Sequence, residues 1–187
     1  MKMKKLVVFV ACAMLAAVTQ AATVGWNLAG ANSYANDAYQ FFVIGQKGVT
    51  DIATITALLD AGKDTSSYAL GSGTIASNGG ALALATATGA PTLNAGTYST
   101  FFVVFDDASP ASGSANYAVV SGAANLTKTI AATTANVTFA AGNQSTYLND
   151  TKNWKSFGPT SGGVPEPTSG LLLLVGAGML ALRRKQK

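Results

Sequence analysis

The sequence predicts a mostly β fold: an antiparallel β-sandwich-like passenger with one short helix, flanked by an N-terminal signal peptide and a C-terminal transmembrane helix. Two observations predict the β passenger. Short runs of aromatic and β-branched residues recur along the chain, and stretches rich in Gly, Pro, Asn and Ser separate them. A third observation predicts the flanks, because an apolar run beside basic residues lies near each end of the 187 residues. This length corresponds to about one domain.

The N-terminal segment has the three parts of a secretory signal peptide. Its basic region contains Lys2, Lys4 and Lys5. An apolar run over residues 6–18 follows, and Thr19-Gln20-Ala21 supplies small residues for cleavage. We therefore expect residues 1–21 to be removed between Ala21 and Ala22, with a cut one residue later as the alternative. A lipid-attachment site at Cys12 is disfavoured, because the apolar run before it is short.

The predicted passenger domain covers residues 22–155 and contains six strand-like runs. The strongest covers residues 98–105, where aromatic and β-branched side chains end at two aspartates. The others cover residues 39–44, 116–120, 126–131, 136–139 and, with weak alternation, 81–88. Short strands at this spacing are typical of an antiparallel sandwich or barrel, and we expect roughly seven in all.

One helix is predicted over residues 51–61. Thr50 or Asp51 can cap its N-terminus, apolar residues recur at helical spacing, and Gly62 ends it. We expect this helix to cover one end or edge of the sheet. The predicted core consists of apolar residues from the strands and the helix: Phe41, Val43, Ile55, Leu59, Phe102, Val104, Val119 and Phe139.

Composition excludes several kinds of chemistry. The chain has no histidine, and its single cysteine, Cys12, lies inside the predicted signal peptide. A zinc site with histidine or cysteine ligands and a catalytic triad with a histidine base are therefore excluded for the passenger, as is a disulfide within it. We expect no cofactor and no metal site.

Charge is unevenly distributed. The formal net charge is +4, but five lysines and seven aspartates between residues 22 and 164 leave the passenger at −2. The positive charge belongs to the two flanks. Nucleic-acid binding needs a basic patch on the folded domain, so we expect no nucleic-acid partner.

Two groups of passenger residues could have a function. Asp106 and Asp107 follow the strongest strand and could bind calcium, but a solvated turn is the favoured interpretation. Four aromatic residues lie near the two ends of the passenger: Trp26, Tyr147, Trp154 and Phe157. They could form a platform for sugar rings. We favour the alternative that they pin the ends of the passenger to the sheet.

The C-terminal segment begins after a spacer at residues 156–163 and has three parts in order. Pro165, Glu166 and Pro167 come first, an apolar run over about residues 168–182 follows, and Arg183, Arg184 and Lys185 form a basic tail. As a helix, the run would be about 22 Å long, which is short for a bilayer core of about 30 Å. Basic residues beside a transmembrane segment stay cytoplasmic. We therefore expect a membrane helix with the passenger on the far side.

These three parts resemble the PEP-CTERM sorting signal of bacterial surface and exopolysaccharide-associated proteins. The resemblance is confined to residues 164–187. It implies recognition by an exosortase, a membrane-embedded cysteine transpeptidase-like enzyme, and cleavage near Pro165, Glu166 and Pro167. The catalytic residues would belong to that enzyme, and this chain would be its substrate.

The sequence therefore predicts an exported, non-enzymatic surface or extracellular-matrix protein of structural or interaction type. It would be anchored in the inner membrane during sorting and would then reach the cell surface or the matrix, where extracellular polysaccharide is a candidate partner. A carbohydrate-binding or adhesin module on the same anchor is the alternative. An enzyme that uses only Asp, Ser and Lys is a third interpretation, and it requires these residues to gather in a cleft.

Overall fold

The computed structural model describes residues 21–77, 82–86 and 91–159. The predicted signal peptide, except for Ala21, and the predicted transmembrane helix lie outside these ranges, so both stay predictions. Within them the chain forms eleven strands: β1 (Ala22–Ala31), β2 (Ala38–Val43), β3 (Gly71–Thr74), β4 (Ala76–Ser77), β5 (Leu82–Thr86), β6 (Thr92–Leu93), β7 (Gly96–Phe105), β8 (Asn116–Val120), β9 (Thr127–Ile130), β10 (Asn136–Asn143) and β11 (Trp154–Ser156). The helices are α1 (Ile52–Asp60), α2 (Ser145–Asn149) and three short 3₁₀ turns, η1 (Asn32–Tyr34), η2 (Ala124–Leu126) and η3 (Thr151–Asn153).

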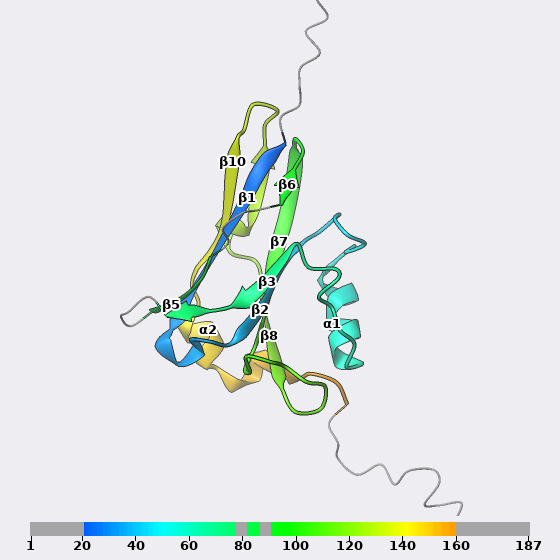
Figure 1. Ribbon diagram of the computed structural model, residues 1–187, viewed down its shortest axis with the longest axis vertical. Coiled ribbons are helices and arrows are strands. Elements are labelled where there is room, and N and C mark those ends of the chain that lie inside the picture. Colours follow the sequence, from blue (N-terminus) through cyan, green and yellow to red (C-terminus); the bar gives the residue numbers. More distant parts are fainter. Residues whose placement is uncertain (1–20, 78–81, 87–90, 160–187) are drawn as a thin grey trace, which may run out of the picture.

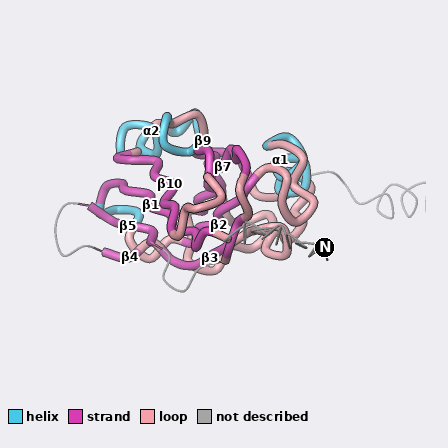
Figure 2. Tube along the Cα trace, turned by 90° about the horizontal axis from the view of Figure 1, so that it is seen from above, coloured by secondary structure: helices cyan, strands magenta, loops and turns pink. Residues whose placement is uncertain are grey.

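The strands form two sheets. The first sheet has the order β10-β1-β5-β4, and β6 also pairs with β1. The second has the order β11-β8-β7-β2-β3, and β9 pairs with β7. Figure 2 shows the first sheet, the second sheet and α1 following one another across the molecule. The prediction of a mostly β fold with antiparallel sheets and few helices is confirmed.

One pair of strands departs from the predicted antiparallel arrangement. β1 and β10 run parallel, from Thr23 opposite Asn136 to Ala29 opposite Asn143, with an irregularity between Asn27 and Leu28. Parallel neighbours need a long connection. Here most of the passenger lies between the two strands in the sequence. Their pairing therefore brings the N-terminal and C-terminal parts of the passenger together in the first sheet.

The main core lies between the two sheets. Val24, Trp26 and Leu28 of β1 alternate with more exposed residues, and they pack against Phe41 of β2 and Phe102 of β7 in one buried cluster. The rings of Phe41 and Phe102 lie 5.0 Å apart. The alternation from Ala22 to Leu28 gives this part of the first sheet one buried face.

A second core covers the other face of the second sheet. Ile55 and Leu59 of α1 are buried there with Phe42 and Phe101, whose rings stack 5.0 Å apart. The prediction that the helix covers an end or edge of the sheet is therefore wrong. Successive residues of β2 and β7 point to opposite faces of the second sheet, and both faces carry large apolar side chains. The face that is turned away from the first sheet is therefore shielded from water by α1.

Most of the predicted helix and core is confirmed. Asp51 caps α1 by accepting a hydrogen bond from the backbone N–H of Thr54 at 2.7 Å. Seven of the eight predicted core residues are buried, although Ile55 and Leu59 belong to the second core. Val119 is only half-buried. It lies on the face of β8 that is turned toward α1, but it lines a groove beside the helix and is not packed beneath it.

The two ends of the described chain lie at opposite ends of the molecule (Figure 1). β1 begins at one end of the long axis, and Ala22, the first residue after the predicted cleavage point, is fully buried there. The chain leaves at the other end after β11, where the backbone N–H of Gly158 donates a hydrogen bond to Leu59 of α1. We call this second end the exit end of the passenger.

Candidate functional site: a groove at the exit end of the passenger

The four aromatic residues singled out in the sequence do not form one platform. Trp26 is only 6% exposed, because it stacks on Phe41 with ring centroids 4.8 Å apart. Its Nε1 donates a hydrogen bond to the Tyr39 hydroxyl at 3.0 Å. Phe157 is 7% exposed and meets Phe105 edge-on at 5.5 Å. These two residues pin the ends of the passenger, as the favoured interpretation predicts.

Trp154 has a different position. It is half-buried and stacks on Tyr34, with ring centroids 6.0 Å apart and planes inclined by 17°. Its Nε1 donates a hydrogen bond to the carbonyl of Leu148 at 2.7 Å. The Tyr34 hydroxyl donates to Oδ1 of Asn149 at 2.8 Å. Each ring is therefore fixed at its polar edge by α2, and Tyr34 is a residue that sequence reasoning missed.

The two stacked rings line a groove of about 430 Å³. We call it the Tyr34–Trp154 groove. Its other walls come from α2, η3 and the ends of β7 and β8: Asp106, Asn116, Leu148, Asn149 and Thr151. Asp106 accepts two hydrogen bonds from Asn116, one from its backbone N–H at 2.6 Å and one from Nδ2 at 2.7 Å. The groove thus combines aromatic surface with amide, hydroxyl and carboxylate groups.

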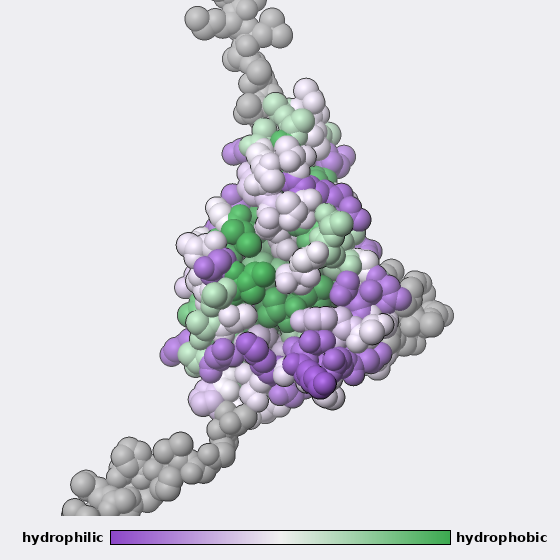
Figure 3. Space-filling view, turned by 180° about the vertical axis from the view of Figure 1, so that it is seen from behind, coloured by the Kyte–Doolittle hydropathy of each residue, from purple (hydrophilic) through white to green (hydrophobic). Residues whose placement is uncertain are grey.

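A second groove, of about 470 Å³, lies between α1 and β11. Ile52, Val119 and Tyr147 give it apolar walls, and Lys155 lies at its side. The Tyr147 hydroxyl donates a hydrogen bond to the carbonyl of Val119 at 2.8 Å, so Tyr147 holds α2 on β8. Figure 3 shows hydrophobic residues gathered in the middle of the rear face and hydrophilic ones toward the exit end.

Asp106 and Asp107 form the solvated turn that the sequence favours. Both are exposed, and Oδ1 of Asp107 accepts a hydrogen bond from the backbone N–H of Ser109 at 2.8 Å. Within the described ranges no group of three or more His, Cys, Asp or Glu residues could hold a metal ion. The geometry of the pair is that of a turn.

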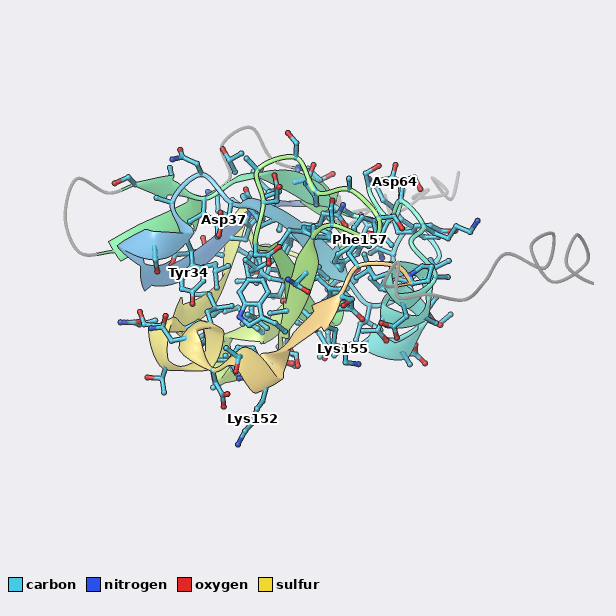
Figure 4. The ribbon with its side chains drawn as sticks, turned by 90° about the horizontal axis from the view of Figure 1, so that it is seen from below. Tyr34, Asp37, Asp64, Lys152, Lys155 and Phe157 are labelled. Carbon is cyan, nitrogen blue, oxygen red and sulfur yellow. The ribbon has the colours of Figure 1, made fainter. Side chains whose placement is uncertain are left out.

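The half-buried Asp37 is electrostatically coupled to this turn. Burial, together with the negative charges of Asp106 and Asp107, raises the pKa of Asp37 from 3.8 to about 6. Burial and the charge of Asp37 also raise the pKa of Tyr34. Figure 4 shows Asp37 and Tyr34 on the same side of the exit end, and Lys152 pointing away into solvent. Asp106, which lines the groove, thus belongs to a group of three neighbouring aspartates with Asp37 and Asp107.

Replacement of Asp37 by asparagine should change the pH dependence of stability. A folded-state pKa above the unfolded value means that the folded protein binds this proton more tightly, so stability falls as pH rises from about 4 to about 6. Asp37→Asn should remove this slope and raise the free energy of unfolding at pH 8 by about 1 kcal/mol, a value discounted for solvent screening. Urea unfolding at several pH values measures it. An unchanged slope would contradict the assignment.

The remaining aspartates of the described chain have structural partners. Asp60 accepts a hydrogen bond from the Tyr117 hydroxyl at 2.6 Å. Asp64 accepts from the backbone N–H and the hydroxyl of Ser66, which lowers the pKa of Asp64. Asp150 accepts from the backbone N–H of Lys152 at the start of η3. Like Asp51, these groups hold helix ends, turns and packed faces.

The predicted processing residues lie mostly outside the described ranges. Ala21 and Ala22 stand at the start of β1. Pro165, Glu166, Pro167, Arg183, Arg184 and Lys185 fall among the undescribed residues, so their roles stay predictions. No helix in the ranges that the structure describes is long and apolar enough to cross a membrane. The expected membrane helix over residues 168–182 lies beyond those ranges.

Comparison with protein families identifies the C-terminal segment. A family model described as the PEP-CTERM protein-sorting motif matches residues 163–186, which include the Pro-Glu-Pro element and the basic residues. Comparisons with curated proteins and with solved structures find no match. The chain therefore carries a PEP-CTERM sorting motif at its C-terminal end, as the resemblance in the sequence predicts.

The motif defines a class of proteins by the way in which they are sorted. It implies export, association with the membrane during sorting, and processing by an exosortase. The motif covers only residues 163–186, so it assigns no role to the passenger.

Proposed function

We propose that this chain is a non-enzymatic exported protein that an exosortase delivers to the cell surface or the extracellular matrix, where the passenger has a structural or interaction role. The PEP-CTERM motif at residues 163–186 carries this proposal. In this account the Pro-Glu-Pro element is the processing point, the apolar run holds the chain in the inner membrane, and the basic tail stays in the cytoplasm.

The position of the exit end supports the proposal. Phe157 is packed against Phe105, and the backbone N–H of Gly158 donates a hydrogen bond to the carbonyl of Leu59 at 2.8 Å. The folded passenger is thus fixed through Gly158, which is the third residue of the predicted spacer at 156–163. Five residues lie between Pro159 and Pro165, so the six steps along the chain reach at most about 20 Å. Before cleavage, the exit end therefore stays near the membrane and the start of β1 points away from it.

The distribution of polar groups supports a non-enzymatic passenger. The passenger has neither histidine nor cysteine, because the single cysteine, Cys12, lies in the predicted signal peptide. An acid–base or nucleophilic site would therefore depend on Asp, Ser, Thr, Lys or Tyr. Four of its seven aspartates, Asp51, Asp60, Asp64 and Asp150, are spread over helix ends and turns, and only Asp37, Asp106 and Asp107 lie near one another. Most of them accept hydrogen bonds from nearby backbone or side chains. Enzymes instead bring such groups together in one cleft.

Substitution of the Pro-Glu-Pro element tests the proposal. Replacement of Pro165, Glu166 and Pro167 by alanine in the producing bacterium should leave the chain uncleaved, so that its full-length form accumulates in the membrane fraction. Replacement of the neighbouring Thr168 and Ser169 by alanine is the matched control and should leave processing intact. Immunoblots of the membrane, surface and medium fractions measure both. Normal release of the triple variant would overturn the assigned processing role.

A further inference from the structure

We propose that the Tyr34–Trp154 groove is a binding site for a pyranose ring of a neutral polysaccharide. Such a site would give the passenger a binding role that is separate from its sorting. Its volume of about 430 Å³ lies within the range of about 300–1,000 Å³ that is usual for small-molecule sites. A groove at the surface, and not an enclosed cavity, can admit one unit of a long chain while the neighbouring units stay outside.

Two aromatic rings line the groove. Trp154 and Tyr34 stack nearly parallel, inclined by 17°, and both residues line the groove, where they put apolar ring surface beside polar edges. A pyranose ring has an apolar face of C–H groups and a rim of hydroxyls, so it matches a flat aromatic surface with polar neighbours. The rings that fill the main core, such as Trp26, are buried and have no such access.

Hydrogen bonds preorganise both rings of the groove. The hydrogen bonds from Trp154 Nε1 to the Leu148 carbonyl and from the Tyr34 hydroxyl to Asn149 hold both rings at their polar edges. Asp150 caps η3, which leads directly into Trp154. Rings that are already fixed lose little conformational entropy when a ligand binds.

Polar side chains of the groove also face solvent. Nδ2 of Asn149, Oδ1 of Asn116 and the Thr151 hydroxyl make no hydrogen bond with any residue in the part of the chain that the structure describes. They supply donors and acceptors for sugar hydroxyls. The carboxylate of Asp106, fixed by Asn116, can accept from a hydroxyl as well. Neutral sugars need this mixture of donors and acceptors.

Charge selects the class of sugar. Asp106 lies in the wall of the groove. Asp37 is close enough to both Asp106 and Asp107 for their negative charges to raise its pKa. Lys152, the basic residue of η3, points into solvent (Figure 4). A uronic acid or a sulfated sugar would meet this negative wall and be repelled. The site therefore favours neutral hexose polymers over acidic ones.

The experiment is an NMR titration of the full chain in a detergent without a sugar headgroup. The chain has two tryptophans, so the indole N–H signal of Trp154 reports the groove and that of Trp26 reports the main core. Cellohexaose, mannohexaose and galactohexaose are the probes, with an oligogalacturonate of equal length as the acidic comparison. We expect at least one neutral probe to shift the Trp154 signal saturably while the Trp26 signal stays in place.

Three variants sharpen the test. Asn149→Ala should weaken binding at least about tenfold, because it removes a hydrogen-bonding side chain and releases Tyr34. Trp154→Ala should abolish binding measured by calorimetry, and an unchanged Trp26 signal will show that the variant is folded. Tyr68→Ala removes a half-buried aromatic residue beside the second core, away from the groove, and should bind as the natural chain does.

Two results would overturn the proposal. One is the absence of any Trp154 shift with all neutral probes at about 10 mM, a concentration that detects even millimolar affinity. The other is equal or tighter binding of the oligogalacturonate, which would exclude the neutral class. Neither result depends on whether the C-terminal motif is cleaved, so the proposal can fail while the sorting account stands.

Discussion

Replacement of Gly71 by alanine is expected to lower the free energy of unfolding by about 3 kcal/mol. Gly71 begins β3, and a methyl group at this position would overlap the indole ring of Trp26. That ring cannot move aside, because it stacks on Phe41 and is hydrogen-bonded to Tyr39. Added volume in a closely packed core forces side chains and backbone out of place, which costs about 1–3 kcal/mol or more.

Gly73 of the same strand provides the matched control. A methyl group there would lie 3.4 Å from the ring of Tyr39, an ordinary contact at the edge of the sheet. Gly73→Ala should therefore change stability by less than about 1 kcal/mol, since it also reduces the freedom of the unfolded chain. Urea unfolding followed by tryptophan fluorescence compares the two. Equal losses in both variants would show that the strand resists any side chain and that Trp26 is not the reason.

Replacement of Phe41 by alanine is expected to cost about 3–5 kcal/mol, the range for deleting a buried aromatic side chain. Phe41 is fully buried in β2, and its ring lies 4.8 Å from Trp26 of the first sheet and 5.0 Å from Phe102 of the second. It is also 6.0 Å from Phe139 of β10. This one ring thus joins the two sheets, and the cavity it would leave has no neighbour free to fill it.

Phe41→Leu is the graded comparison, because it keeps part of the volume and should cost less than half as much. Calorimetric and urea unfolding of the three proteins give the ranking. A loss below about 1 kcal/mol for Phe41→Ala would contradict the assignment of this ring to the centre of the main core. The result would then favour a core held chiefly by the strands around it.

The elements that follow a strong local pattern could be predicted from the sequence. The run at residues 98–105 and that at residues 116–120 became β7 and β8, because their aromatic and β-branched side chains suit buried strands. The helix was predictable because Asp51 and the spacing of Ile55 and Leu59 agree with one another. Each of these signals is contained in about ten residues.

Other elements depend on distant partners. β1 is rich in Ala and Gly, and its alternation of Val24, Trp26 and Leu28 was the one local signal that could have revealed it. Its parallel pairing with β10 is not encoded in either segment alone. The short strands β3, β4, β6 and β11 pair with longer neighbours and carry little pattern of their own.

The candidate groove was hidden for the same reason. Sequence reasoning grouped Trp154 with Trp26 and Phe157 because all three are aromatic and near the ends of the passenger. Only the fold shows that Trp26 and Phe157 are buried and that the partner of Trp154 is Tyr34, from the turn after β1. The sorting motif was predictable in full, because it is linear and needs no folded partner within the passenger.

The most direct test of the account is mass spectrometry of the C-terminus of this protein, recovered separately from the membrane, the surface and the medium of the bacterium that produces it. We expect the mature chain to end near Pro165, Glu166 and Pro167, with everything from Leu171 onward absent. Recovery of most of the protein with residues 171–187 still attached would contradict the account. The segment would then be a permanent membrane anchor and not a processing signal.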